Sequence, residues 1–213
     1  MTRLIFIRHG QSIANVKHIF AGQADYDLTE LGHMQAERTA AYVMENYQID
    51  VIYSSDLVRA YHTAKHVADN LGIETITNQN LREIYAAQWQ GLTYDEILER
   101  YMDDYNAWLH DIGNSHCTGG ESVQQLSDRV CHEVEKIVEE NVGKTILIVT
   151  HATPIRALQC RWSNKSLNDM KDVPWVPNSS VSVMNLKNNA CTLEVWGEDG
   201  YLEGIKSSFP ANV

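Results

Sequence analysis

The stretch that decides the fold reads Leu4-Ile5-Phe6-Ile7-Arg8-His9-Gly10, four apolar residues followed at once by two basic side chains and a glycine. A run that is apolar at every position is typical of a strand covered on both faces, as in a parallel sheet. A second such run, residues 145–149, leads into Thr150-His151. Both runs therefore predict buried strands that end at polar side chains.

Working outward from these runs, strand patterns alternate with helical ones. Strands are predicted at residues 4–7, 50–54, 73–77, 145–149, 180–186 and 190–196, the last two as a hairpin joined near Asn188-Asn189. Helices are predicted after a Thr29 cap, from a Ser55 or Asp56 cap to residue 71, and at about 93–110, 121–141 and 154–162. Repeated strand-helix-strand units predict one α/β domain over residues 1–213 with a largely parallel sheet.

Composition bounds the function. The 213 residues carry 17 Lys plus Arg against 28 Asp plus Glu, a net charge of −11, which argues against a nucleic-acid partner. The apolar runs are far shorter than the ~20 residues of a spanning helix, so no membrane partner is expected. Four cysteines without CxxC pairing predict reduced thiols in a cytoplasmic protein. The sequence leaves open whether the chain forms a homodimer.

Chemically useful side chains follow four of the predicted strands. Arg8 and His9 follow the first, Arg59 the second, Glu83 the third and His151 the fourth. Because the carboxyl ends of parallel strands lie along one edge of a sheet, these residues are expected to gather there. Guanidinium groups match phosphate oxygens, an imidazole can attack phosphorus, and a carboxyl can move a proton. The residues expected at this edge of the sheet therefore predict phosphoryl transfer.

The same residues stand in longer motifs that occur in family order. These are residues 4–12 with Asn15, 22–29 with Gly32, 53–60 with Thr63, 81–83 with Trp89 and Gly91, 120–122, and 149–151 with 154–156. On these motifs the chain resembles the histidine phosphatase superfamily, in its phosphoglycerate mutase-like branch. The resemblance implies a three-layer α/β/α sandwich with a small helical lid at about residues 84–119.

The resemblance also implies a role for each residue. His9 would be the nucleophile that becomes phosphohistidine, Glu83 the proton donor and acceptor, and Arg8, Arg59 and His151 the groups that hold the phosphoryl oxygens. Further phosphate- or substrate-binding positions are implied at Ser12, Asn15, Gln23 and Ala152. At the position of Ala152, relatives commonly have Gly. This route needs no metal and no cofactor, and its partner is a small phosphorylated metabolite.

Three functions remain open after the resemblance. Phosphatase-like members read Leu-Arg-Glu and then Trp-x-Gly, as Leu81-Arg82-Glu83 and Trp89-Gln90-Gly91 do here. The span between Arg100 and Arg129 holds five acids and no Lys or Arg, which suits a mutase poorly because a mutase must retain a bisphosphorylated intermediate. Hydrolysis is therefore favoured over a mutase, and a non-catalytic member that only binds phospholigands is the third alternative.

Two further groups of residues have competing interpretations. Six aromatic side chains could cover the non-phosphate part of a substrate or pack the helical segment onto the sheet; they are Tyr85, Trp89, Tyr94, Tyr101, Tyr105 and Trp108. His62 and His66 lie four apart on a predicted helix and could bind a metal. With no third ligand at a suitable spacing, a solvated helix face is expected and no metal is predicted.

Overall fold

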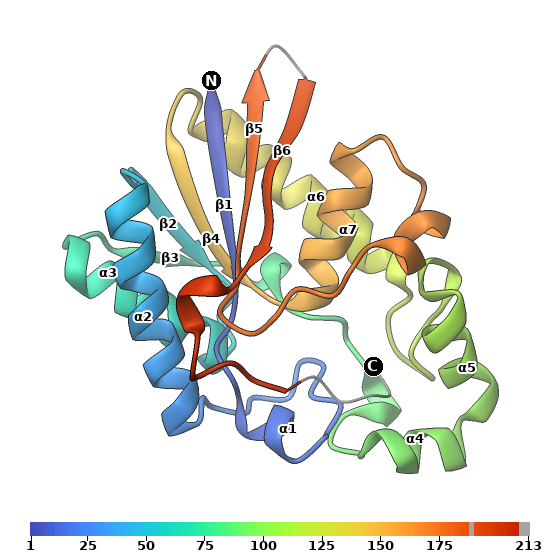
Figure 1. The fold of residues 1–213 in the computed structure, drawn as a ribbon. Coiled ribbons are helices and arrows are strands. Elements are labelled where there is room, and N and C mark those ends of the chain that lie inside the picture. The colour runs from blue at the N-terminus through green and yellow to red at the C-terminus, as the bar shows by residue number, and fades with distance from the viewer. Residues whose placement is uncertain (188–189, 209–213) are drawn as a thin grey trace.

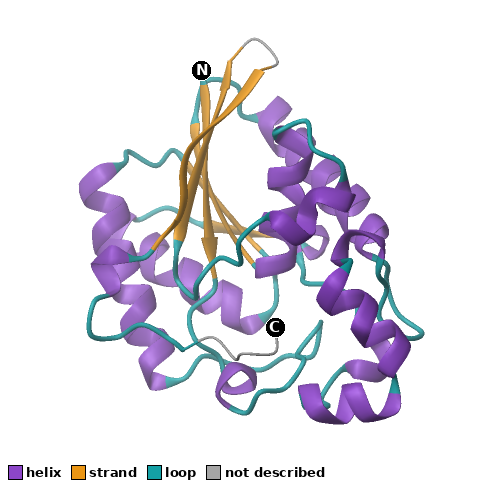
Figure 2. Ribbon diagram, turned by 45° about the vertical axis from the view of Figure 1, so that its right-hand side comes forward, coloured by secondary structure: helices purple, strands orange, loops and turns teal. Residues whose placement is uncertain are grey.

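The computed structural model describes residues 1–187 and 190–208, in which one six-stranded sheet lies between two layers of helices (Figures 1 and 2). The strands are β1 (Thr2–Arg8), β2 (Val51–Ser54), β3 (Thr75–Thr77), β4 (Thr145–Thr150), β5 (Val181–Lys187) and β6 (Ala190–Glu198). Their order is β3-β2-β4-β1-β5-β6. The first four in this order run parallel, β5 is antiparallel to β1, and β6 is antiparallel to β5. The predicted α/β class with a largely parallel sheet is confirmed.

The helices divide between the two faces of the sheet. They are α1 (Ile13–Val16), α2 (Glu30–Asn46), α3 (Val58–Leu71), α4 (Tyr94–Arg100), α5 (Met102–His110), α6 (Val123–Glu140) and α7 (Ala152–Trp162). In Figure 1, α2 and α3 lie to the left of the sheet and α6 and α7 to its right, while α4 and α5 stand apart at the lower right. The arrangement is the three-layer α/β/α sandwich.

The apolar run of β1 is explained by these two layers. Ile5 and Ile7 belong to the core cluster that includes residues of α2 and α3. Leu4 and Phe6 belong to the other cluster, with residues of α6 and α7. All four side chains have zero exposure. Because successive side chains of a strand point to opposite faces of the sheet, β1 contributes to both cores.

The predicted cap of α3 is wrong. The residue before the helix is Leu57, whose side chain makes no capping hydrogen bond, whereas Ser55 and Asp56 were the expected caps. The amide of Val58 instead donates to Oδ1 of Asp25 over 2.8 Å. A carboxylate from a distant loop thus satisfies the helix terminus, which leaves the two polar residues available for contacts at the site.

Other boundaries differ by small amounts. The helix expected at 93–110 is divided at Tyr101, which ends α4 and precedes α5. The hairpin of β5 and β6 is confirmed by their antiparallel pairing, but Asn188-Asn189 lies outside the described residues. Within the described part of the chain, every helix is too short or too polar to cross a bilayer.

Candidate active site

Strand register brings the two histidines together. β1 and β4 are parallel neighbours with Arg8 opposite Thr150, so the next residue of each strand is a histidine. The rings of His9 and His151 are 5.1 Å apart between centroids, edge to face at 61°. Their meeting therefore follows from the pairing of two strands that are separated by more than half of the chain.

His9 is held in one tautomer. Its Nδ1 lies 2.7 Å from the carbonyl oxygen of Gly10, and because a carbonyl only accepts, Nδ1 carries the proton. Nε2 is therefore the nitrogen with a lone pair, and His9 lines a pocket of polar and aromatic residues at this edge of the sheet. Burial and the charges of Arg59 and Arg8 hold the pKa of His9 well below its usual range, which keeps the ring neutral and nucleophilic.

Gly10 is required by a close approach to α2. A Cβ built on Gly10 would lie 2.5 Å from the carbonyl oxygen of Gly32, a backbone atom with little freedom to move. The amide of Gly10 also donates to Oγ1 of Thr63 on α3. Two helices therefore fix the peptide that orients the imidazole of His9, a stronger role than the tight turn that its sequence context suggests.

The two arginines of the pocket are held by backbone carbonyls. Arg59 is 1% exposed and donates from Nη1 to the carbonyl of Ala24 and from Nη2 to that of Gly22. Arg8 donates from Nη1 to the carbonyl of Val176 over 2.7 Å. Burial lowers the pKa of both guanidinium groups to about 10, so both remain charged at neutral pH. Both arginines line the pocket, where they can meet phosphoryl oxygens.

Glu83 lies at the N-terminus of α7. Its Oε1 accepts from its own neighbour, the amide of Ile84, and its Oε2 accepts from the amide of Thr153 over 3.4 Å. Desolvation raises the pKa of the carboxyl, against the opposing effect of these hydrogen bonds. A carboxyl with a raised pKa retains its proton closer to neutrality, as a proton donor requires.

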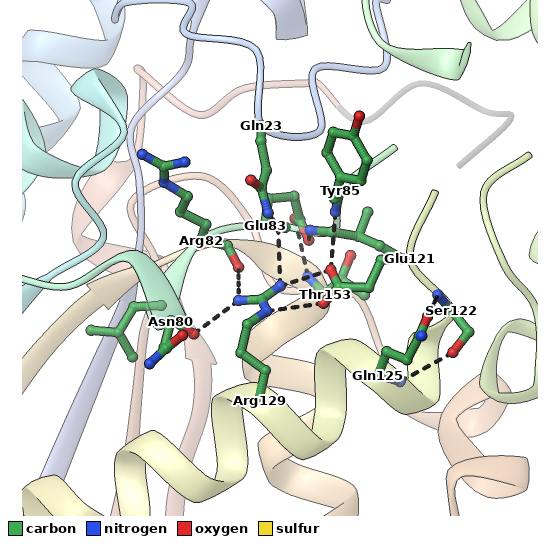
Figure 3. A network of polar contacts seen from close by, with 12 residues as sticks. Gln23, Asn80, Arg82, Glu83, Tyr85, Glu121, Ser122, Gln125, Arg129 and Thr153 are labelled. Atoms are coloured by element: carbon green, nitrogen blue, oxygen red, sulfur yellow. Dashed lines mark hydrogen bonds and ion pairs between the residues drawn. The ribbon is translucent and has the colours of Figure 1, made fainter. Parts of the chain in front are cut away.

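Arg129 holds the segment that carries Glu83, and no motif or strand end in the sequence points to this residue. From α6 its guanidinium reaches upward in Figure 3 and donates to the carbonyls of Asn80, Arg82 and Glu83. It also forms a bidentate ion pair with Glu121, in which Nε donates to Oε1 over 2.9 Å and Nη2 donates to Oε2 over 2.8 Å. Glu121 belongs to a family motif, but its pairing with Arg129 is known only from the structure. The pair also neutralises one of the five acids that the sequence counted against a mutase.

The smaller predicted contacts divide into two groups. Ser12, Asn15 and Ala152 all line the pocket. The Oδ1 atom of Asn15 accepts from Ser12 and from Nδ2 of Asn178, so its NH2 group is the part that can serve a ligand. Gln23 is outside the lining residues, and its Nε2 donates to the carbonyl of Glu83. The position of Gln23 favours support of the Glu83 segment.

His151 lies behind the pocket wall. It has zero exposure and is not among the lining residues. Its Nε2 is 2.9 Å from Oγ of Ser55, while its Nδ1 is buried and has no hydrogen-bond partner among the residues that the structure describes. Burial and the nearby charge of Arg59 lower the pKa of His151 well below its usual range. An orphaned nitrogen next to His9 fits a group that acquires its partner from a bound ligand.

Aromatic side chains line the same pocket as the charged groups. Tyr94 and Trp108 line the pocket together with Phe20 and Trp175, which the sequence did not single out. The Cζ atom of Arg156 lies 3.9 Å from the ring centroid of Trp175. Of the other four aromatics in the predicted lid, Trp89 and Tyr105 are buried in the core, Tyr101 packs against it and Tyr85 is exposed. Packing against the core is therefore observed for Trp89, Tyr101 and Tyr105, and a substrate cover formed by Tyr94 and Trp108 stays a prediction.

The family model described as the histidine phosphatase superfamily (branch 1) matches residues 4–199. The chain belongs to this superfamily. Phosphoglycerate mutase-like protein 4 of Arabidopsis thaliana is 32% identical over 203 residues, which cover 94% of this chain and 86% of that protein. Phosphoserine phosphatase 1 of Hydrogenobacter thermophilus is 33% identical over 160 residues, 75% of each protein.

Solved structures agree with this membership. The structure of a mycobacterial glucosyl-3-phosphoglycerate phosphatase in complex with VO3 superposes with a TM-score of 0.87 at 29% identity. The match covers 92% of this chain and 99% of the other. The fold inferred from sequence motifs is therefore shared along almost the full length of a phosphatase.

Proposed function

We propose that the protein is a metal-independent phosphomonoester hydrolase that acts through a phosphohistidine on a small phosphorylated metabolite. The observation that carries the proposal is the hydrogen bond from Nδ1 of His9 to the carbonyl of Gly10, which leaves Nε2 as a neutral nucleophile in a pocket with Arg8 and Arg59. Membership of the superfamily and similarity to proteins named phosphatases support it.

In the first half-reaction Nε2 of His9 attacks phosphorus. The N–P bond forms while the bond from phosphorus to the ester oxygen breaks, and Glu83 transfers its proton to that oxygen. The Nδ1 proton stays on the ring, where the carbonyl of Gly10 stabilises the positive charge that develops. Arg8 and Arg59 stabilise the charge on the phosphoryl oxygens.

In the second half-reaction a water molecule attacks the phosphorus of the phosphoenzyme. The Glu83 carboxylate takes a proton from that water, and the electrons of the N–P bond return to Nε2 of His9. Inorganic phosphate is released, and both residues return to their starting protonation states. We propose that the unpartnered Nδ1 of His151 binds a phosphoryl oxygen on His9 in both halves, which the distance of 5.1 Å between the two ring centroids supports.

The pocket favours a substrate with one phosphoryl group and an apolar portion. Its lining includes two arginines and four aromatic residues. We propose that residues 84–119 act as the lid, because Tyr94 and Trp108 reach the pocket from this segment. A cytoplasmic location fits four free cysteines.

Hydrolysis of p-nitrophenyl phosphate by the wild type and by His9→Ala tests the nucleophile. Loss of turnover and of acid-labile ³²P labelling in the variant is expected, and equal rates would overturn the assignment. EDTA is expected to leave the rate unchanged.

A mutase remains the second candidate because one relative is named phosphoglycerate mutase-like. Assays of 3-phosphoglycerate with and without 2,3-bisphosphoglycerate, alongside phosphoserine and sugar monophosphates, distinguish isomerisation from release of phosphate. If no phosphomonoester is turned over, binding without catalysis is the function that remains.

A further inference from the structure

Four potential metal ligands meet on the outer surface of the layer formed by α2 and α3. His33 comes from α2, His62 and His66 from α3, and Asp27 from the loop that precedes α2. All four are half-buried. The two helices lie side by side in Figure 1, which brings His33 close to His62 and His66 on α3. From the sequence alone, His62 and His66 had no third ligand.

The ligand atoms are already close together. Nδ1 of His33 lies 3.2 Å from Nε2 of His66, and Nδ1 of His62 lies 2.7 Å from Oδ1 of Asp27. The ring of His33 is 5.9 Å from that of His62 between centroids. One ligand atom from each of Asp27, His33 and His62 falls within 4.8 Å of the other two. The cluster thus spans one small volume and two helices.

These separations approach those of a tetrahedral zinc site. Ligands at about 2.0–2.1 Å from Zn²⁺ are about 3.3 Å from one another at the tetrahedral angle. The distance of 3.2 Å between the nitrogens of His33 and His66 already matches this value. Within the group of Asp27, His33 and His62, a separation of up to 4.8 Å needs a contraction of up to about 1.5 Å, which half-exposed side chains reach by rotation about χ1 and χ2.

The donor set selects among metals. Three imidazoles with one carboxylate suit Zn²⁺ and its transition-metal neighbours, whereas Mg²⁺ and Ca²⁺ take oxygen ligands. The one lysine that lines the same hollow, Lys65, places its Nζ 2.7 Å from Asp69, so its charge is directed to that carboxylate. No part of this cluster belongs to the phosphate pocket.

We propose that Asp27, His33 and His62 form a Zn²⁺ site, with His66 as the fourth ligand. The ion would join α2 to α3 and to the loop that carries Asp27. The proposal is independent of the phosphatase function, because it uses none of the residues of the pocket and requires no turnover.

Calorimetric titration of the untagged, EDTA-treated chain with ZnCl₂ tests the site. We expect one ion per chain, and a loss of affinity of about tenfold or more in both His33→Gln and His62→Gln. The exposed His132 on α6 provides the matched control, since His132→Gln should bind as the wild type does. Saturation with Zn²⁺ at about 100 times Kd should raise Tm by about 5–10 °C, and EDTA should reverse the rise.

A titration of His9→Ala distinguishes the site from the catalytic pocket, whose histidines could also attract Zn²⁺. Equal affinity in His9→Ala and the wild type supports the proposed site. The proposal is overturned if His9→Ala abolishes binding, if the His33 and His62 variants bind as tightly as the wild type, or if Kd exceeds about 1 mM.

Discussion

Replacing Arg129 with Met removes the side chain that holds the Glu83 segment. The pair of Arg129 with Glu121 is largely buried, with side-chain exposures of 20% and 14%. Removing one partner of a buried pair costs about 3–5 kcal/mol, and the residual exposure places this pair near the lower end, at about 3 kcal/mol. For a chain of this size that loss corresponds to a fall in Tm of about 6–12 °C. Urea unfolding measures the free energy directly.

The kinetic effect of Arg129→Met should depend on the leaving group. The carbonyls of Asn80, Arg82 and Glu83 each lose a donor, and among the described residues only that of Glu83 keeps another, Nε2 of Gln23, so the backbone that positions the carboxyl is held less firmly. A displacement of about 1 Å can reduce a rate about 100-fold. We therefore expect kcat/KM to fall about 10- to 100-fold for alkyl phosphates, whose leaving oxygen needs a proton, and only a few-fold for p-nitrophenyl phosphate.

Two further variants isolate the cause. Arg161→Met removes an exposed arginine that is 3.2 Å from Glu135, with exposures of 59% and 42%, and should change stability by less than about 1 kcal/mol. Arg129→Met combined with Glu121→Gln should recover part of the stability, because no unpaired carboxylate remains, but not the leaving-group dependence. The reasoning is refuted if Arg129→Met affects good and poor leaving groups equally.

Three other predictions concern the pocket. Because the pKa of Glu83 is raised, its proton-donating form persists to higher pH than that of an ordinary carboxyl. The kcat for alkyl phosphates should therefore fall as pH rises through this pKa. In a pH–rate profile, Glu83→Gln should remove that fall. Trp175→Ala should raise KM about 2- to 12-fold for substrates with an aromatic portion and leave KM for phosphoserine nearly unchanged, as steady-state assays would show; equal changes for both would contradict an aromatic wall. Gly10→Ala places a Cβ 2.5 Å from the carbonyl of Gly32 and should cost about 1–3 kcal/mol in urea unfolding, whereas Gly200→Ala meets only the flexible end of a side chain and should be nearly neutral; equal losses would contradict the role of the close approach.

The site residues that could be predicted from the sequence are those that directly follow strands. Periodicity located both central strands, and their parallel pairing then required the residues after Arg8 and Thr150 to be neighbours. Arg59 and Glu83 reach the same pocket because each follows another strand of that sheet. Residues at strand ends are therefore accessible to prediction, since one-dimensional patterns define where strands stop.

The residues that support these groups were not predictable in the same way. Arg129 stands on a helix with no local feature to distinguish it, and its value depends on which carbonyls lie opposite. Trp175 follows no strand, and it lines the pocket beside Arg156 only through the packing of the segment after α7. His33 illustrates the same limit, because the spacing of His62 and His66 gives no information on the neighbouring helix.

The net charge of −11 is compatible with the proposed phosphate pocket because of how the arginines are paired. Arg129 and Arg82 donate to carboxylates, those of Glu121 and Asp56, which cancel their charge. Arg59 donates to the carbonyls of Gly22 and Ala24, and a carbonyl fixes a guanidinium without neutralising it. Arg8 is held in the same manner by the carbonyl of Val176. A carboxylate in place of either set of carbonyls would fix the arginine equally well but would compete with phosphate, so neutral acceptors are the arrangement that the proposed binding of an anion by an acidic protein requires.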